Sequence, residues 1–126
     1  MSYIIKPKRN SDWRKHTRNN LLAEVIMYER IVVNKFASSM LTKIVAKVIN
    51  WAKRGDLHSR RLSLRYLDNR KNTFSSDDKG NSVKLMDKLF NDLGKRYKDR
   101  LGGYTRISKV DNRQGDNSPT VIFSLV

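Results

Sequence analysis

The chain has 126 residues and a mass of 14.7 kDa, and its 27 lysines and arginines outnumber 12 acidic residues, giving a formal net charge of +15 at pH 7. It contains no cysteine, which excludes disulfides and cysteine-based zinc sites. No apolar run approaches the roughly 20 residues of a membrane span, and the start lacks the apolar segment of a secretory signal. We therefore expect a cytoplasmic protein without a membrane partner.

Residues 1–12 are predicted to form a basic N-terminal arm. The segment carries lysine, arginine and Pro7 but shows no sustained apolar period, so it has no face to bury. Residues 13–126 contain periodic apolar blocks and are predicted to form one domain, because this length suits a single small core.

The first helix is predicted from Trp13 to Glu29, with Ser11 or Asp12 as its N-terminal cap. Its apolar stripe starts at Leu21, and the two turns before it are polar and basic, so we expect them to project beyond the core. The short β-branched run Arg30–Asn34 then predicts a strand.

The strongest helical signal lies between Met40 and Ala52, where apolar residues recur at i, i+1, i+4 and i+5 and predict a broad buried face. Gly55 suits the left-handed residue that ends this helix, and Asp56 can cap the next helix. That helix is predicted from Leu57 to Leu67. Three of its leucines are expected to be buried, namely Leu57, Leu64 and Leu67.

A polar, aperiodic segment at residues 69–82 is predicted to be a surface loop. The last helix is predicted from Val83 to Leu93, and Gly94 is expected to stop it. Residues 104–110 and 121–126 read as two strands that pair as a hairpin across turn-forming residues.

The predicted order is thus helix, strand, three helices and two strands. Few strands and segregated helices indicate an α+β fold, in the form of a two-layer helix/sheet domain. The basic arm would be an N-terminal extension of this domain.

Positive charge gathers in three clusters: the N-terminal arm, KRGDLHSRR at Lys53–Arg61, and KRYKDRLGGYTRISK at Lys95–Lys109. The last cluster holds a single acid, Asp99, and a double glycine where backbone can approach a partner closely. Because the clusters share one sign, an anionic partner would remove their repulsion, and this pattern is typical of nucleic-acid binding. Tyr97 and Tyr104 suit either of two roles, stacking on unpaired bases or packing in the core.

Catalytic and metal-binding patterns are not evident in the sequence. His16 and His58 lie far apart without partner ligands, so we predict no metal site and no cofactor. No phosphate-binding loop, dinucleotide fingerprint, nucleophile motif or carboxylate pair stands out. We therefore predict no enzyme and no small-molecule substrate, with a small nucleic-acid enzyme as the less favoured reading.

Four segments together resemble one protein family. They are KRGDLHSRR, KLFNDLGKRYKDR, GGYTRI and the R-x-G-D-N-x-P pattern at Arg113–Pro119. In order and spacing they are similar to the bacterial-type large-subunit ribosomal protein numbered seventeen, over nearly the whole chain. The resemblance implies a structural constituent of the large ribosomal subunit, which binds the large-subunit ribosomal RNA beside neighbouring ribosomal proteins and supports subunit assembly and translation.

The resemblance also implies a set of RNA-binding residues. The basic ones at matching positions are Arg9, Arg14, Lys15, Lys53, Arg54, Arg60, Arg61, Arg96, Lys98, Arg100, Arg106, Lys109 and Arg113. The turn motif adds Gly102, Gly103 and Tyr104. Arg18 joins the set because Asn19 stands where the family carries an arginine.

Besides Asn19, the chain departs from the family pattern at NKFASSM after the first strand and at further places. MSYIIKPK stands where the family has a denser arginine- and histidine-rich arm, Trp13 stands where a histidine is common, and the loop at residues 69–82 is longer. Charge alone supports a free-standing RNA-binding regulator or RNA chaperone equally well, so only the order of the motifs favours the ribosome.

Overall fold

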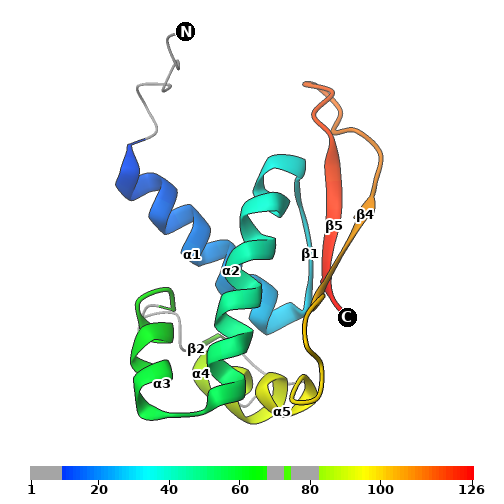
Figure 1. Cartoon of the computed structure of the whole chain (residues 1–126). Coiled ribbons are helices and arrows are strands. Elements are labelled where there is room, and N and C mark those ends of the chain that lie inside the picture. Colours follow the sequence, from blue (N-terminus) through cyan, green and yellow to red (C-terminus); the bar gives the residue numbers. More distant parts are fainter. Residues whose placement is uncertain (1–9, 68–72, 75–82) are drawn as a thin grey trace, which may run out of the picture.

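The computed structural model of the protein describes residues 10–67, 73–74 and 83–126, so the predicted arm up to Arg9 and most of the predicted loop lie outside the described residues. Helices occupy one part of the molecule and a small sheet the other (Figure 1). In chain order the elements are α1 Ser11–Tyr28, β1 Arg30–Asn34, α2 Lys35–Arg54, α3 Leu57–Leu64, β2 Thr73–Phe74, β3 Val83–Lys84, α4 Leu85–Asp87, the π-helical η2 Lys88–Leu93, α5 Gly94–Arg96, β4 Thr105–Lys109 and β5 Thr120–Leu125.

Helix α1 begins earlier than predicted, because Asn10 is its cap. The extended backbone of Asn10 lets its Oδ1 accept the N–H of Trp13 at 2.8 Å. The predicted cap at Ser11 or Asp12 is therefore wrong. The buried part of α1 starts only at Leu22, and the turns before it project away from the sheet as predicted (Figure 1).

Strands β1, β5 and β4 form an antiparallel sheet in that order. The predicted β4–β5 hairpin is confirmed, and β1 pairs with the other edge of β5. Alternation points Val33, Val121 and Phe123 toward the helices, where all three are buried. The predicted two-layer α+β fold is confirmed.

Helix α2 is the central element of the core and contacts α1, α3, α5 and the sheet (Figure 1). The predicted face is buried through Leu41, Val45, Val48, Ile49 and Ala52. The helix starts at Lys35 because the Asn34 side chain accepts the N–H of Phe36 at 3.1 Å. The predicted left-handed Gly55 and the Asp56 cap are both confirmed, with φ +70° at Gly55 and the Ser59 N–H donating to Asp56 at 3.0 Å.

The prediction that Leu57 and Leu64 are buried in helix α3 is wrong. It ends at Leu64, and Leu57 and Leu64 are 64% and 39% exposed. Ser59 and Ser63 are buried instead, because their small side chains let α3 lie close against α2. Leu67, just beyond the helix, is fully buried as predicted.

The predicted helix from Val83 is also revised at both ends. Val83–Lys84 form strand β3, which pairs with Thr73–Phe74 of the segment predicted as loop. Gly94 does not stop the helix, which continues without a break in helical backbone to Arg96. A Cβ at Gly94 would lie 2.9 Å from the carbonyl oxygen of Ala52, so this glycine permits close helix packing.

Replacing Gly94 with alanine is expected to lower the free energy of unfolding by about 1–2 kcal/mol, because overpacking against a backbone carbonyl outweighs the higher helix propensity of alanine. Urea denaturation measures the change. Gly102→Ala is the control, since a Cβ at Gly102 meets no atom within 4 Å. Equal stability of the two variants would contradict the packing role of Gly94.

Candidate nucleic-acid interface

The projecting half of α1 carries the first basic group. Arg14 and Lys15 are exposed, and Arg18 is half-buried. The guanidinium of Arg18 lies 5.0 Å from the centroid of the Tyr66 ring, beyond the end of α3. Arg9, the remaining predicted residue of this group, lies outside the described residues.

The corner between α2 and α3 carries the second group. Arg54 and Arg61 are exposed, whereas Arg60 places its guanidinium 4.8 Å from the centroid of the Phe90 ring. Lys53 turns toward the third basic cluster, where its Nζ donates to the carbonyl of Arg100 at 2.6 Å. This lysine therefore joins two clusters that lie far apart in the sequence.

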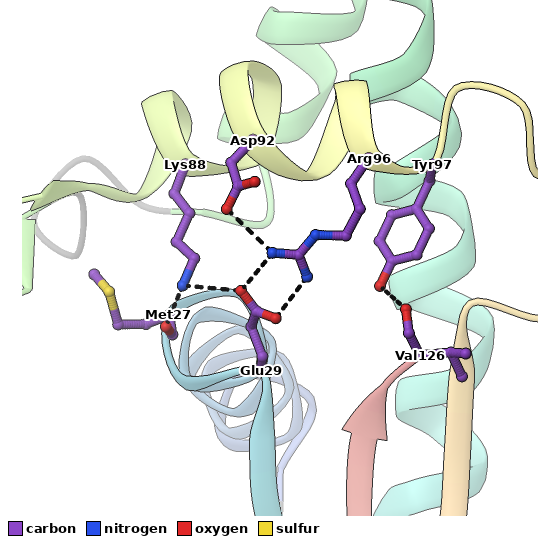
Figure 2. Close-up of polar contacts among 7 residues, drawn as sticks. All are labelled: Met27, Glu29, Lys88, Asp92, Arg96, Tyr97 and Val126. Atoms are coloured by element: carbon purple, nitrogen blue, oxygen red, sulfur yellow. Dashed lines mark hydrogen bonds and ion pairs between the residues drawn. The ribbon is translucent and has the colours of Figure 1, made fainter.

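Arg96 is held against the surface of the fold by an ion-pair network, with its side chain 39% exposed (Figure 2). Its guanidinium donates to both carboxylate oxygens of Glu29, at 2.6 and 3.1 Å, and to Asp92 at 3.3 Å. Lys88 lies 3.4 Å from Glu29 and donates to the carbonyl of Met27 at 2.6 Å. Much of the charge of Arg96 is thus compensated within the protein.

Glu29 is the centre of this network and adopts a left-handed backbone, with φ +59°. The hydrogen bond from Arg96 lowers the pKa of Glu29 below its usual 4.5; partial burial opposes the shift, and the charges of Arg96 and Lys88 reinforce it. The carboxylate is therefore charged at neutral pH and links α1 to η2 and α5.

The turn after α5 presents backbone to solvent. Arg100 donates through Nε to the carbonyl of Gly102 at 3.1 Å, which tightens the turn. Gly103 has φ +65°, a left-handed conformation that glycine adopts without strain. A Cβ at either glycine would meet no atom within 4 Å, and Lys98 beside them is exposed.

Tyr97 and Tyr104 pack in the core, at 2% and 3% exposure, so a stacking role on bases is not open to Tyr104 in this conformation. The rings meet edge to face with centroids 5.3 Å apart. Tyr97 donates its hydroxyl to the Val126 carbonyl at 2.7 Å (Figure 2), and Tyr104 donates to Asn50 Oδ1 at 2.9 Å. The two tyrosines therefore support, from the core, the turn between α5 and β4 that carries Lys98 and Arg100. We call this turn the basic turn.

The hairpin carries the last predicted residues. Arg106 pairs across from Ser124 and Lys109 from Val121, so these two exposed side chains lie on opposite faces of the sheet. Arg113, in the loop, pairs with Asp116, and this hydrogen bond lowers the Asp116 pKa to about 2. The hairpin residues therefore do not share one surface.

The first two groups and the basic turn, in contrast, join into one surface. Lys53 connects the α2–α3 corner to the turn, and a shared pocket connects α1 to the end of α3. We define the basic band as Arg14, Lys15, Arg18, Lys53, Arg54, Arg60, Arg61, Lys98, Arg100, Gly102 and Gly103.

Lys47, Trp51, Arg65 and Tyr66 also adjoin this band, although sequence reasoning did not assign them to RNA. In the sequence, Lys47 and Arg65 lie on the polar sides of their predicted helices. Trp51 and Tyr66 belong to no pattern that indicates RNA binding. Their helical spacing carries no information about which neighbouring helix lies alongside. Only the arrangement of α1, α2 and α3 brings them together.

Two kinds of feature are absent from the described part of the chain, a metal-binding group and a membrane-spanning helix. Among the described residues, no group of three or more histidine, aspartate or glutamate side chains is placed to hold a metal ion. No helix in the described part of the chain has the length and apolarity to cross a membrane.

Comparisons of the sequence with known proteins point to a single family. Residues 17–126 match the sequence model of a family described as ribosomal protein L17. The chain is 44% identical over 126 residues to the large ribosomal subunit protein bL17 of Mesoplasma florum, with 100% of each chain covered. Proteins of the same name from Caldanaerobacter subterraneus subsp. tengcongensis and Enterococcus faecalis are 40% and 39% identical, over 100% of this chain and 100% and 99% of theirs.

Replacing Glu29 with glutamine is expected to lower the free energy of unfolding by about 1–2 kcal/mol at about pH 7, because Arg96 and Lys88 lose a charged acceptor. The pKa of Glu29 is lower in the folded state, so its contribution is present above about pH 4.5 and is lost as the pH falls through the folded-state value. Urea denaturation of wild type and variant at about pH 7 and about pH 3 measures both effects, and the difference should shrink at the lower pH.

Arg113→Gln is the matched control, since it breaks an ion pair whose side chains are exposed to solvent. We expect its stability to equal that of the wild type within measurement error. A Glu29→Gln variant as stable as this control would show that the network does not stabilise the fold.

Proposed function

Because the chain belongs to the ribosomal protein L17 family and is a structural component of the large ribosomal subunit rather than an enzyme, we propose that it binds the RNA of that subunit through its basic band. The family match and the full-length relatives decide between a ribosomal protein and a free-standing regulator, which charge alone left open. The RNA contact itself rests on the band.

The observation that carries the proposal is a set of exposed cations without compensating acids. Five basic side chains of the band have no hydrogen-bond, ion-pair or ring partner within the described part of the chain; they are Arg14, Lys15, Arg54, Arg61 and Lys98. Arginine grips phosphate through paired N–H groups and lysine acts as a point charge. We assign these five side chains to phosphates of folded RNA.

Other predicted residues have a supporting part in the proposal. Lys53, Arg96 and Arg100 each contact protein groups, so they position the band and reach RNA only with their remaining N–H donors. Gly102 and Gly103 leave the backbone open to close approach by the RNA. Contacts of this kind read the shape and the 2′-hydroxyls of RNA more than its base sequence.

The proposal extends to two outlying regions. The segment that precedes α1 in the sequence, including Arg9, adds further positive charge. Arg106, Lys109 and Arg113 on the hairpin form further, separate contacts outside the band, with Arg106 and Lys109 on opposite faces of the sheet. Neighbouring ribosomal proteins are further partners in the proposal, and Phe36, at 87% exposure, is an apolar side chain available to them.

Changing Arg54, Arg61 and Lys98 together to glutamine is expected to weaken binding to purified large-subunit ribosomal RNA by roughly 10- to 100-fold at moderate salt. Because three phosphate contacts are lost, the slope of log Kd against log salt concentration should fall by about 2–3. Filter binding at several salt concentrations measures both quantities. The melting temperature should stay unchanged, since none of the three side chains contacts the core.

The matched control changes Lys35, Lys43 and Lys84 to glutamine, which removes the same charge from exposed positions outside the band. We expect this control to bind the RNA with a lower Kd than the band variant. The slope of its log Kd against log salt concentration should also be clearly steeper. If both variants lost affinity equally, net charge rather than the band would govern RNA binding, and the proposed interface would be wrong.

A further inference from the structure

A pocket of about 400 Å³ lies where α1, α2 and the end of α3 meet. Its lining brings together four cations and two aromatic residues: Lys15, Arg18, Lys47, Arg65, Trp51 and Tyr66. A hollow of this size is in the range of small-ligand sites.

The aromatic residues hold two of the cations in place. The guanidinium of Arg18 lies 5.0 Å from the centroid of the Tyr66 ring, and Nζ of Lys47 lies 5.2 Å from the Trp51 ring. The two rings contact each other, with centroids 5.7 Å apart and planes tilted by 45°. An aromatic face attracts a cation without neutralising it, so both groups are oriented while their charge stays available to an anion.

No acid among the described residues pairs with these four cations. Within the described residues, the lining contains no carboxylate, and none of its four cations forms an ion pair. Arg96 and Arg113 differ in this respect, because Glu29 and Asp116 bind them. Like charges gathered in a hollow repel one another, and an anionic ligand removes that repulsion.

The turn after α3 fixes the position of Arg65 and Tyr66 before any ligand arrives. Their backbone N–H groups donate to the carbonyls of Leu62 and Ser63, at 3.2 and 3.0 Å. Leu67, the next residue, is fully buried and anchors the turn to the core. A site held in place in the free protein loses less conformational entropy on binding.

We infer that this pocket binds a phosphate of the ribosomal RNA backbone where the backbone bends into the protein surface. Arg18 and Arg65 supply forked N–H donors to the phosphate oxygens, and Lys15 and Lys47 supply point charges. The inference rests on the proposed function, since the ligand is the same RNA. It adds a preformed subsite that depends on Lys47 and Arg65, two residues outside the basic band.

The first experiment compares two full-length double variants in binding to purified large-subunit ribosomal RNA. Lys47→Gln with Arg65→Gln should raise the Kd by roughly 5- to 20-fold and reduce the salt slope by about 1–2. Lys43→Gln with Lys84→Gln removes the same charge from exposed positions that do not line the pocket, and should change both quantities less.

The second experiment uses Trp51 as a reporter inside the pocket. The chain has two tryptophans, so Trp13→Phe leaves Trp51 as the only one. Saturating RNA should change the emission of Trp51 in this background, and adding Lys47→Gln and Arg65→Gln should abolish most of the change. Circular dichroism confirms that each variant is folded before titration.

Several outcomes would overturn the inference. Pocket and control variants of equal affinity, together with a Trp51 signal that RNA does not alter, would show that no phosphate enters the pocket while the wider RNA interface stands. A pocket variant that binds isolated RNA normally but fails to enter large subunits would assign the pocket to a carboxylate of a neighbouring protein. Wild-type protein that does not bind the RNA at all would overturn the proposed function itself.

Discussion

Ala52 and Gly94 bring two helix backbones so close that one methyl group on the glycine would meet a carbonyl oxygen of α2. This approach sets the position of α5 against the end of α2, and with it everything that follows α5. Tyr97 and Tyr104 then pack edge to face below the basic turn, and Lys53 reaches across to the carbonyl of Arg100. The place of the turn on the basic band, and the path of the chain into β4, depend on the close approach of Gly94 to the backbone carbonyl of Ala52.

The fold distributes its positive charge in three ways. Some cations meet carboxylates: Arg96 meets Glu29 between elements of the core, and Arg113 meets Asp116 in an exposed loop. Others rest on aromatic rings or backbone carbonyls, which orient them without removing their charge; Arg18, Lys47 and Lys53 belong to this class. A third set, within the described part of the chain, is exposed and unpaired, as at Arg14, Arg54 and Arg61. A net charge of +15 is therefore compatible with a folded domain, because no charged side chain in the described part of the chain is buried in the core.

This arrangement suits a structural protein of a ribonucleoprotein particle. The helices and the turn after α5 carry the basic band. The sheet covers one side of the helices (Figure 1). The projecting half of α1 extends the band beyond the globular part, so the surface proposed for RNA is long. Most residues of this proposed surface are not core residues, and Lys53, Arg96 and Arg100 contact other protein groups.

Local chemistry in the sequence determined the order of the elements, the buried face of α2, the end of that helix at Gly55, the three basic clusters and the family motifs. Each of these depends on residues within a turn or two of one another, or on the order of short motifs, so a linear pattern records it. Only the tertiary structure decided that Tyr97 and Tyr104 are core residues, that Arg96 pairs with Glu29 across 67 positions of sequence, and that Lys47 and Arg65 share a pocket with α1. The physical reason is that burial and pairing are set by whichever helix lies alongside, and that neighbour is fixed by packing of the whole core.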